Sequence, residues 1–185
     1  MSSKKVRVAI IGVGNCAAAL VQGVHFYRNA PDDEFIPGLM HARVGGYHVS
    51  DIEFSAAIDI DSEKVGKDLS EAIWSGPNNT IKFADVPHMG VTVSRGVTED
   101  GLGKYLKQRI TPAEGAPVDI VRLLQETRTD VVVNFLPVGS EKATRYYVEQ
   151  ILEAGCGMVN CIPVFIAREN EWQERFRERG LPVIG

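Results

Sequence analysis

Short apolar runs alternate with segments of helical periodicity along most of this 185-residue chain. The clearest runs are VRVAII at 6–11 and DVVVNFL at 130–136, and neither shows the polar alternation of a half-exposed strand. Strands of this kind are typical of parallel sheets that helices cover on both faces. Because crossovers between such strands are right-handed, the pattern predicts an α/β fold with a doubly wound parallel sheet of the Rossmann type.

The expected elements follow one another in chain order. Strands are expected at 6–11, 52–60, 91–94, 130–136, 158–162 and 181–184. Helices are expected at 15–27, from Asp61 through Ile73, from Pro117, from Ser140 to Gly155, and from a cap at Asn170 to Gly180. Apolar residues recur at intervals of three or four along these helices, which predicts one face packed on the sheet.

Two long segments interrupt the alternation, at about 29–50 and 76–115. Each stands where a short connection is usual, and loops of this length are commonly functional or disordered. Their apolar and amide side chains, such as Met40, Tyr47 and Asn78, favour ordered loops. We therefore expect one domain over 1–185 with two loop insertions.

Composition argues against several classes of protein. Twenty Lys and Arg against 24 Asp and Glu give a net charge of −4, whereas nucleic-acid binding calls for a basic surplus. No apolar run approaches the roughly 20 residues that span a bilayer. The three cysteines form no CxxC motif, which favours a reduced, cytoplasmic setting. His41, His48 and His88 lack metal-site spacing, so no metal is expected.

A glycine motif follows the first expected strand and opens the first expected helix. The sequence GVGNCA at 12–17 fits the dinucleotide-binding pattern G-x-G-x-x-G/A. Gly12 permits the tight turn, Gly14 lets a pyrophosphate approach the backbone, and Ala17 lets the helix pack close to the strand. The free N–H groups of the helix N-terminus would bind the phosphates.

An acidic residue at the end of the second strand is the usual partner of such a loop. Asp59 stands there and predicts hydrogen bonds to the ribose diol of NAD, with repulsion of the extra phosphate of NADP. Its distance from Gly12 exceeds the usual interval of about 20 residues, and the 29–50 insertion accounts for the excess. The alternative is that Asp59 and Asp61 only cap the next helix; Asp61 suits that role better.

A second loop follows the strand at 130–136, on the other half of the expected sheet. Ligands of doubly wound sheets lie beyond the carboxyl ends of the strands, so Pro137 and Gly139 would shape a loop beside the cofactor. Ser140 has two open roles, as a helix cap or as a ligand contact.

The sequence also resembles a known family, the inositol-3-phosphate synthases (also called inositol-1-phosphate synthases), in their prokaryotic, actinobacterial-like branch. The resemblance covers nearly the whole chain, from Val6 to Gly185. The motifs that carry it are IGVGNCA at 11–17, PGLMH at 37–41, AAIDID at 56–61, KVGKDLSEAI at 64–73, NNTIK at 78–82, FLPVGSE at 135–141 and NCIPVFIA at 160–167.

The resemblance implies an NAD-dependent isomerase of inositol and phospholipid biosynthesis. The family converts glucose 6-phosphate to 1D-myo-inositol 3-phosphate by oxidation, enolisation, intramolecular aldol cyclisation and reduction. It also implies a homotetramer and a chain about twice as long, whose further part holds the catalytic lysines and the tetramerisation sheet. This chain is therefore expected to be the NAD-binding part, truncated before the catalytic domain and inactive alone.

The resemblance also implies cofactor-binding residues. They are Gly12, Val13, Gly14, Asn15 and Cys16 at the pyrophosphate, Asp59 at the adenosine ribose, Asn78, Asn79 and Thr80 near the nicotinamide and substrate, and Leu136, Pro137, Val138 and Ser140 on the far side of the cofactor. For the Asn-Asn-Thr motif, the alternative is a turn with a left-handed Asn.

Other functions remain open on the sequence. One is a different NAD-dependent oxidoreductase acting on another small molecule. A second is a nucleotide-sensing module without chemistry, and a third is a partner-binding remnant that binds no nucleotide.

Overall fold

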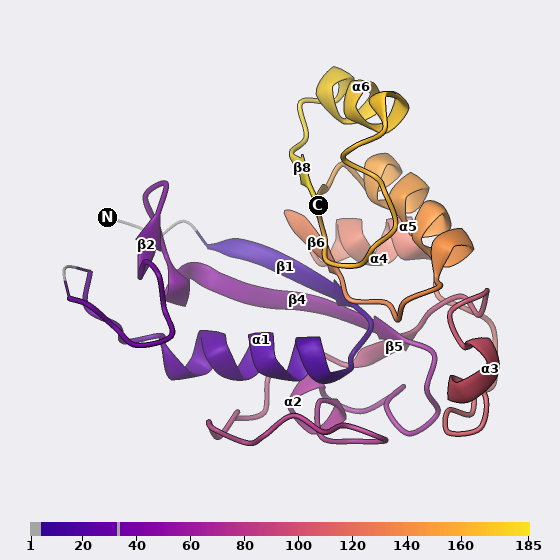
Figure 1. Ribbon diagram of the computed structural model, residues 1–185, viewed down its shortest axis with the longest axis horizontal. Coiled ribbons are helices and arrows are strands. Elements are labelled where there is room, and N and C mark those ends of the chain that lie inside the picture. Colours follow the sequence, from indigo (N-terminus) through magenta and orange to yellow (C-terminus); the bar gives the residue numbers. More distant parts are fainter. Residues whose placement is uncertain (1–4, 33) are drawn as a thin grey trace.

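A six-stranded parallel sheet forms the centre of the structure (Figure 1), a computed structural model that describes residues 5–32 and 34–185. The strands are β1 (Val6–Ile11), β4 (Ile52–Asp59), β5 (Val93–Arg95), β6 (Val131–Asn134), β7 (Gly157–Asn160) and β8 (Val183–Ile184). Their order is β5-β4-β1-β6-β7-β8, and every neighbouring pair is parallel. The chain winds outward in both directions from β1, so the predicted doubly wound α/β fold is confirmed.

Helices cover both faces of this sheet, as Figure 1 shows. On one face lie α1 (Asn15–Phe26) and α2 (Leu69–Ala72); on the other lie α4 (Ile120–Glu126), α5 (Glu141–Ala154) and α6 (Asn170–Glu178). Ile10 packs among the buried residues between the sheet and α1. Its neighbour Ile11 packs between the sheet and α5, and both are fully buried. Successive strand residues point to opposite faces, which explains why the buried residues of β1 are apolar without alternation.

The two helices near the C-terminal end confirm their predicted inner faces. Tyr147 and Ile151 of α5 are buried, and α5 ends at Gly155, whose φ of 80° is the left-handed conformation of a helix stop. Trp172 and Phe176 are the buried residues of α6. Asn170, expected as the cap of α6, is instead its first residue.

The helix expected from Asp61 through Ile73 is wrong for most of its length. The chain forms turns after β4, and only α2 is helical. Gly66 has a φ of 86°, and its N–H bonds to the carbonyl of Val93 at 2.9 Å. The N–H of Val93 in turn bonds to the carbonyl of Lys67 at 2.8 Å. Pairing with β5 therefore replaces the helix, which starts only after its cap, Asp68.

Two other boundaries move for similar reasons. The strand expected at 91–94 starts two residues later, because the carbonyl of Val91 accepts the N–H of Leu69 at 2.7 Å. The helix expected from Pro117 starts at Ile120, because the carboxylate of Asp119 accepts the N–H of Arg122 at 3.0 Å and caps the helix there.

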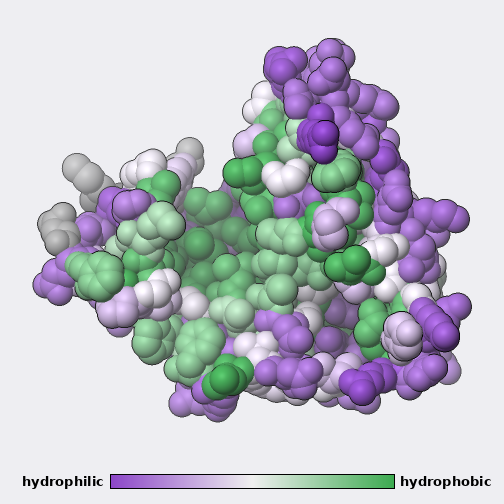
Figure 2. Space-filling view, in the orientation of Figure 1, coloured by the Kyte–Doolittle hydropathy of each residue, from purple (hydrophilic) through white to green (hydrophobic). Residues whose placement is uncertain are grey.

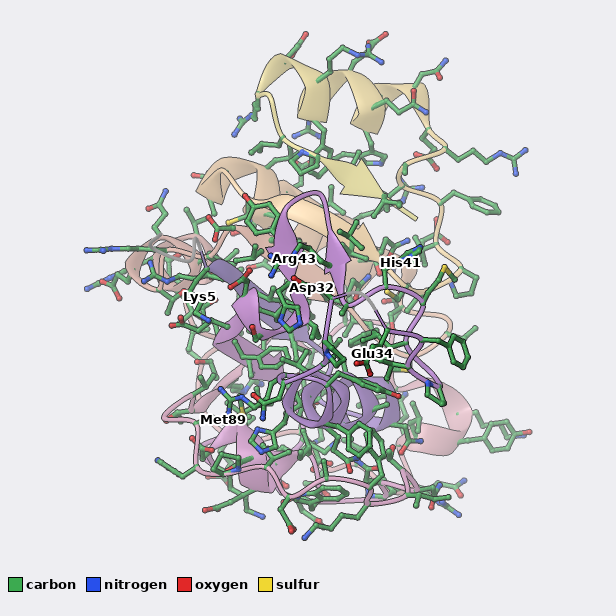
Figure 3. All side chains as sticks on the ribbon, turned by 90° about the vertical axis from the view of Figure 1, so that its left-hand side faces the viewer. Lys5, Asp32, Glu34, His41, Arg43 and Met89 are labelled. Atoms are coloured by element: carbon green, nitrogen blue, oxygen red, sulfur yellow. The ribbon has the colours of Figure 1, made fainter. Side chains whose placement is uncertain are left out.

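Hydrogen bonds within the insertion at 29–50 hold its described residues, 29–32 and 34–50. It contains the hairpin of β2 (Arg43–Val44) and β3 (Tyr47–His48), followed by a 3₁₀ turn, Val49–Asp51. Arg43 donates to Asp32 at 3.1 Å, and these two side chains lie close together in Figure 3. The ring of His48 bonds to the carbonyl of Ala30 at 2.9 Å. The insertion at 76–115 carries β5 and the single turn α3 (Gly103–Leu106).

Figure 2 shows an apolar, hollowed face between the hairpin and the C-terminal elements. The large apolar side chains exposed in these two regions are Phe35, Met40, Val44, Tyr47, Phe165 and Ile184. Within the described residues, no helix is both long and apolar enough to cross a membrane.

Candidate functional site

The carboxyl ends of β1, β4 and β6 bring the predicted glycine loop, Asp59 and the 136–140 loop to one edge of the sheet. The sheet winds away from β1 toward β4 on one side and toward β6 on the other. This switch point is where doubly wound sheets bind ligands. The site is therefore built from the glycine loop outward.

Gly12 fixes the contact between the two halves of the sheet. Its φ is 89°, a conformation that side-chain-bearing residues rarely adopt. A Cβ at this position would lie 2.7 Å from the carbonyl oxygen of Phe135, closer than real contacts allow. The loop after β1 and the loop after β6 thus touch through backbone alone, and only glycine permits this approach.

Gly14 differs, because a Cβ there would meet no atom within 4 Å. It occupies the N-cap position of α1, no side chain caps the helix, and no acidic residue lies in the first turn. The first N–H groups of this 12-residue helix therefore face open space, next to exposed Asn15 and Cys16. Such an N-terminus can hold an anionic group.

The N-terminus of α5 is closed by comparison. Asp100, in the 76–115 insertion, accepts the N–H of Lys142 at 2.7 Å and that of Ala143 at 3.1 Å. Burial alone would raise the pKa of Asp100, but these N–H donors outweigh burial and lower it. Ser140, expected as a possible cap, stands at the N-cap position without a capping side-chain bond. The sequence did not predict this cap, because Asp100 lies far from the start of α5 in the chain.

Asp59 ties the glycine loop to β4. Its Oδ2 accepts the N–H of Val13 at 2.6 Å, and its Oδ1 accepts the N–H groups of Ile60 at 2.7 Å and Asp61 at 2.9 Å. Lys64 places its ammonium nitrogen 4.0 Å from Oδ2. Asp61 begins a turn, since its Oδ1 accepts the N–H of Glu63 at 3.0 Å. No regular helix follows Asp59 directly, so it does not act as a helix cap.

The Asn-Asn-Thr motif lies against the start of α1. Asn15 accepts the N–H of Asn79 at 2.8 Å through its side chain, and the hydroxyl of Thr80 at 3.0 Å through its carbonyl. The side chain of Asn78 accepts the N–H of Thr80 at 2.8 Å and donates to the carbonyl of Ile73. The motif thus forms a turn, but without the left-handed Asn of the alternative, since Arg128 is the one non-glycine residue with positive φ in the described chain.

The 136–140 loop stands opposite the glycine loop. Val138 is exposed, whereas Ser140 is fully buried and its hydroxyl donates to the carbonyl of Pro137 at 2.6 Å. Ser140 thus shapes the loop from inside. Beneath the loop, Asn134 donates to Asn160 at 2.9 Å, and Asn160 donates to the carbonyl of Val164 at 2.7 Å.

The paired amides of Asn134 and Asn160 were not predicted as a pair. Each ends its strand, and the two are direct partners in the register of β6 and β7. Both are buried, where an unpaired amide would be costly. The repeated asparagine near the end of two successive expected strands was the available signal.

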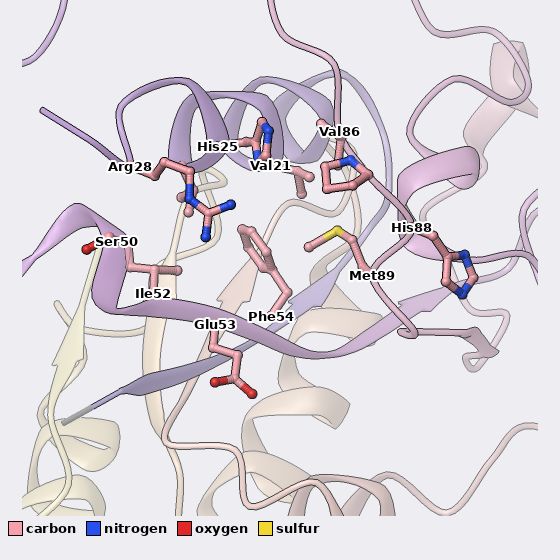
Figure 4. A pocket seen from close by; sticks show the side chains of 12 residues that line it. Val21, His25, Arg28, Ser50, Ile52, Glu53, Phe54, Val86, His88 and Met89 are labelled. Carbon is pink, nitrogen blue, oxygen red and sulfur yellow. The ribbon is translucent and has the colours of Figure 1, made fainter. Parts of the chain in front are cut away.

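A separate cavity of about 230 Å³ lies between α1, β4 and the 86–89 segment (Figure 4). Val21, Phe54 and Met89 line its apolar part, with His25 and Arg28 nearby. None of the predicted site residues lines it. It therefore stands apart from the glycine loop.

Comparison with known proteins shows which proteins the chain is similar to. No protein-family model matches the chain. The inositol-3-phosphate synthase of Corynebacterium glutamicum is 51% identical over all of this chain and 51% of its own length. That of Mycolicibacterium smegmatis is 52% identical over 98% of this chain and 50% of its own. Over its whole length, this chain is related to the inositol-3-phosphate synthases. It spans about half the length of the curated relatives it matches.

Solved structures agree with the fold. The crystal structure of Ari2 superimposes with a TM-score of 0.82 at 34% identity, covering 98% of this chain and 54% of that one. A myo-inositol-1-phosphate synthase-related protein from Thermotoga maritima gives a TM-score of 0.70 at 22% identity, over 98% of this chain and 54% of that one. The second likeness shows the fold alone.

The two glycines of the loop should differ in their effect on stability. We expect Gly12→Ala to lower the free energy of unfolding by about 2 kcal/mol or more, through left-handed strain and overlap with Phe135. Gly14→Ala should cost less than about 1 kcal/mol, since its Cβ meets open space. Urea denaturation followed by circular dichroism measures both, and equal losses would contradict this account of the loop.

The Asp100 cap should give a pH-dependent stability. Asp100→Ala should lower the free energy of unfolding by about 1 kcal/mol at pH 7. The pKa of Asp100 is lowered in the folded state, so its contribution is present above the unfolded value of about 4 and is lost as pH falls through the folded pKa. The difference between variant and parent should therefore vanish in acid. Glu114→Ala, at an exposed position, is the control, and a difference that persists in acid would refute the cap.

Proposed function

We propose that this chain binds NAD at the N-terminus of α1. The observation that carries the proposal is the uncapped start of α1, with open space at Gly14 and the carboxylate of Asp59 bonded to the same loop. In this assignment the pyrophosphate lies over Gly12–Cys16. The adenosine ribose lies at Asp59.

The residues present fit a dinucleotide in charge and in shape. An uncapped helix N-terminus favours the negative pyrophosphate, while the acidic cap of α5 disfavours it at the neighbouring helix. The Asp59 side chain is 12% exposed, which leaves an edge for hydroxyl donors. A carboxylate there accepts the ribose diol and repels a 2′-phosphate, so we assign NAD and not NADP.

The nicotinamide end is assigned to the loops that face each other across the glycine loop. Asn78, Asn79 and Thr80 stand on one side, held by Asn15. Leu136, Pro137 and Val138 stand on the other, and buried Ser140 holds the turn of that loop. When bound, NAD would accept and return a hydride, and the chain's own residues would position it.

We further infer that the protein to which this chain belongs acts as an inositol-3-phosphate synthase on glucose 6-phosphate. The support is 51–52% identity over essentially the whole chain with proteins of that name. Because the chain spans half of those relatives, we assign NAD binding to 1–185 as one domain and the catalytic residues to the other half. We propose that the protein with both halves is an isomerase of inositol and phospholipid biosynthesis. It would work in the cytoplasm as a homotetramer. The exposed apolar face supports contact with further protein surface.

Cofactor binding is testable on the 185-residue chain itself. We expect NADH to bind with enhanced fluorescence, and Gly14→Val to weaken binding at least tenfold, because its side chain would occupy the space proposed for the pyrophosphate. Gly14→Ala should have an intermediate effect. Phe35→Ala, at a 91% exposed position, is the control for binding, and thermal melts verify folding. Unchanged NADH affinity in folded Gly14→Val would refute the cofactor assignment.

Turnover should require the other half of the protein. We expect no conversion of glucose 6-phosphate by the 185-residue chain with NAD. A fusion of this chain to the remaining half of the Corynebacterium glutamicum relative should form inositol phosphate, detected by NMR, and Gly14→Val should abolish it. Turnover by the chain alone would show that the catalytic groups lie in this half. A folded, NADH-binding fusion that leaves glucose 6-phosphate unchanged would count against the synthase assignment.

A further inference from the structure

Lys64 is enclosed to a degree unusual for a lysine. It lies in the turn after β4, where its N–H bonds to the carbonyl of Asp61 at 3.0 Å. Its side chain is 7% exposed, although lysine is almost never buried without a close partner. The groups around its ammonium must therefore explain why it is buried.

The ammonium group of Lys64 has a single charged contact in the described chain. This contact joins Nζ to Asp59 Oδ2 at 4.0 Å, which is longer than a hydrogen bond. No hydrogen bond from Nζ is found among the described residues, yet Nζ is not one of their fully enclosed polar atoms. The ammonium has thus lost most of its water while keeping its donors available.

A second carboxylate lies near the stem of Lys64. A Cβ on Gly76 would lie 2.9 Å from Asp61 Oδ2 and 3.5 Å from Lys64 Cε, so the lysine stem and the Asp61 carboxylate meet beside Gly76. Asp61 is 2% exposed, and its Oδ2 is fully enclosed without a hydrogen-bond partner among the described residues. The turn that encloses Lys64 thus brings a second buried carboxylate near its stem, and a nearby positive charge stabilises ionised carboxylates.

Asp59 does not need Lys64 to satisfy its carboxylate. Three backbone N–H groups, from Val13, Ile60 and Asp61, already bond to its two oxygens. The 4.0 Å gap between Oδ2 and Nζ suits a bridging oxygen about 2.8 Å from each. That oxygen must donate to the carboxylate and accept from the ammonium. A hydroxyl does both.

We propose that Lys64 is a second recognition residue for the adenosine ribose and, with Asp59, decides between NAD and NADP. A ribose hydroxyl bridges the two groups, donating to Asp59 and accepting from Lys64. The negative charge of Asp59 also offsets the positive charge of Lys64. When a substitution removes the carboxylate of Asp59, the ammonium of Lys64 becomes free to bind a 2′-phosphate. This inference rests on the proposed NAD site and names a residue that acts within it.

The test compares NADH and NADPH affinities, by fluorescence titration, in the 185-residue chain and its variants. Lys64→Met should weaken NADH about tenfold, since it removes a charge-assisted hydrogen bond, and Lys64→Arg should restore much of the loss. Asp59→Ser, which removes the carboxylate, should weaken NADH and strengthen NADPH. In the double variant Asp59→Ser/Lys64→Met, the gain in NADPH affinity should disappear.

A merely structural lysine would give a different pattern. It would leave the ratio of NADH to NADPH affinities the same in each Lys64 variant as in its parent. That result, in variants whose thermal melts show a folded chain, overturns the inference while the NAD site stands. If Asp59→Ser fails to fold, the single Lys64 variants still decide, because unchanged NADH affinity in Lys64→Met refutes the bridge. Absence of NADH binding in the parent chain overturns the proposed function, and this inference with it.

Discussion

The carboxylate of Asp59 is the interaction on which the rest of the site depends. It ends β4 and binds the N–H of Val13, so it fixes where the glycine loop stands relative to the neighbouring strand. That position in turn sets the start of α1 and the direction of its free N–H groups. One side chain therefore holds the loop and is proposed to bind the ribose, because Asp59 is already bonded to the loop at the proposed pyrophosphate site.

The two helices that start at this edge of the sheet have opposite electrostatic character. Both α1 and α5 follow strands next to the switch point. Helix α1 begins without a cap, whereas α5 begins at the carboxylate of Asp100. Since a helix N-terminus attracts anions until a carboxylate occupies it, only α1 is left for a phosphate. Asp100 belongs to the 76–115 insertion, so a residue far from α5 in the sequence closes this N-terminus to an anion.

Sequence reasoning reached the parts of this protein that depend on local pattern. The buried strands, α1, the inner face of α5 and the convergence of Gly12, Asp59 and the 136–140 loop follow from apolar runs and from the rule that ligands lie at strand ends. The helix after Asp61 failed because Gly66 pairs with Val93, a contact between distant segments that periodicity cannot reveal. The Asp100 cap escaped prediction for the same reason.

Side-chain hydrogen bonds fix the conformation of the loop after β6, and this lowers the entropic cost of binding a ligand there. Its base is a chain of buried amides from Asn134 to Asn160 and on to the carbonyl of Val164. Its turn is closed by the hydroxyl of Ser140, and Gly12 presses against its first peptide. A loop that is already ordered loses little conformational entropy when a ligand arrives. The Asn-Asn-Thr turn is likewise tied to Asn15. Both loops proposed to flank the nicotinamide are therefore ordered without a ligand, so their hydrogen bonds would lower the entropic cost of binding without touching the cofactor.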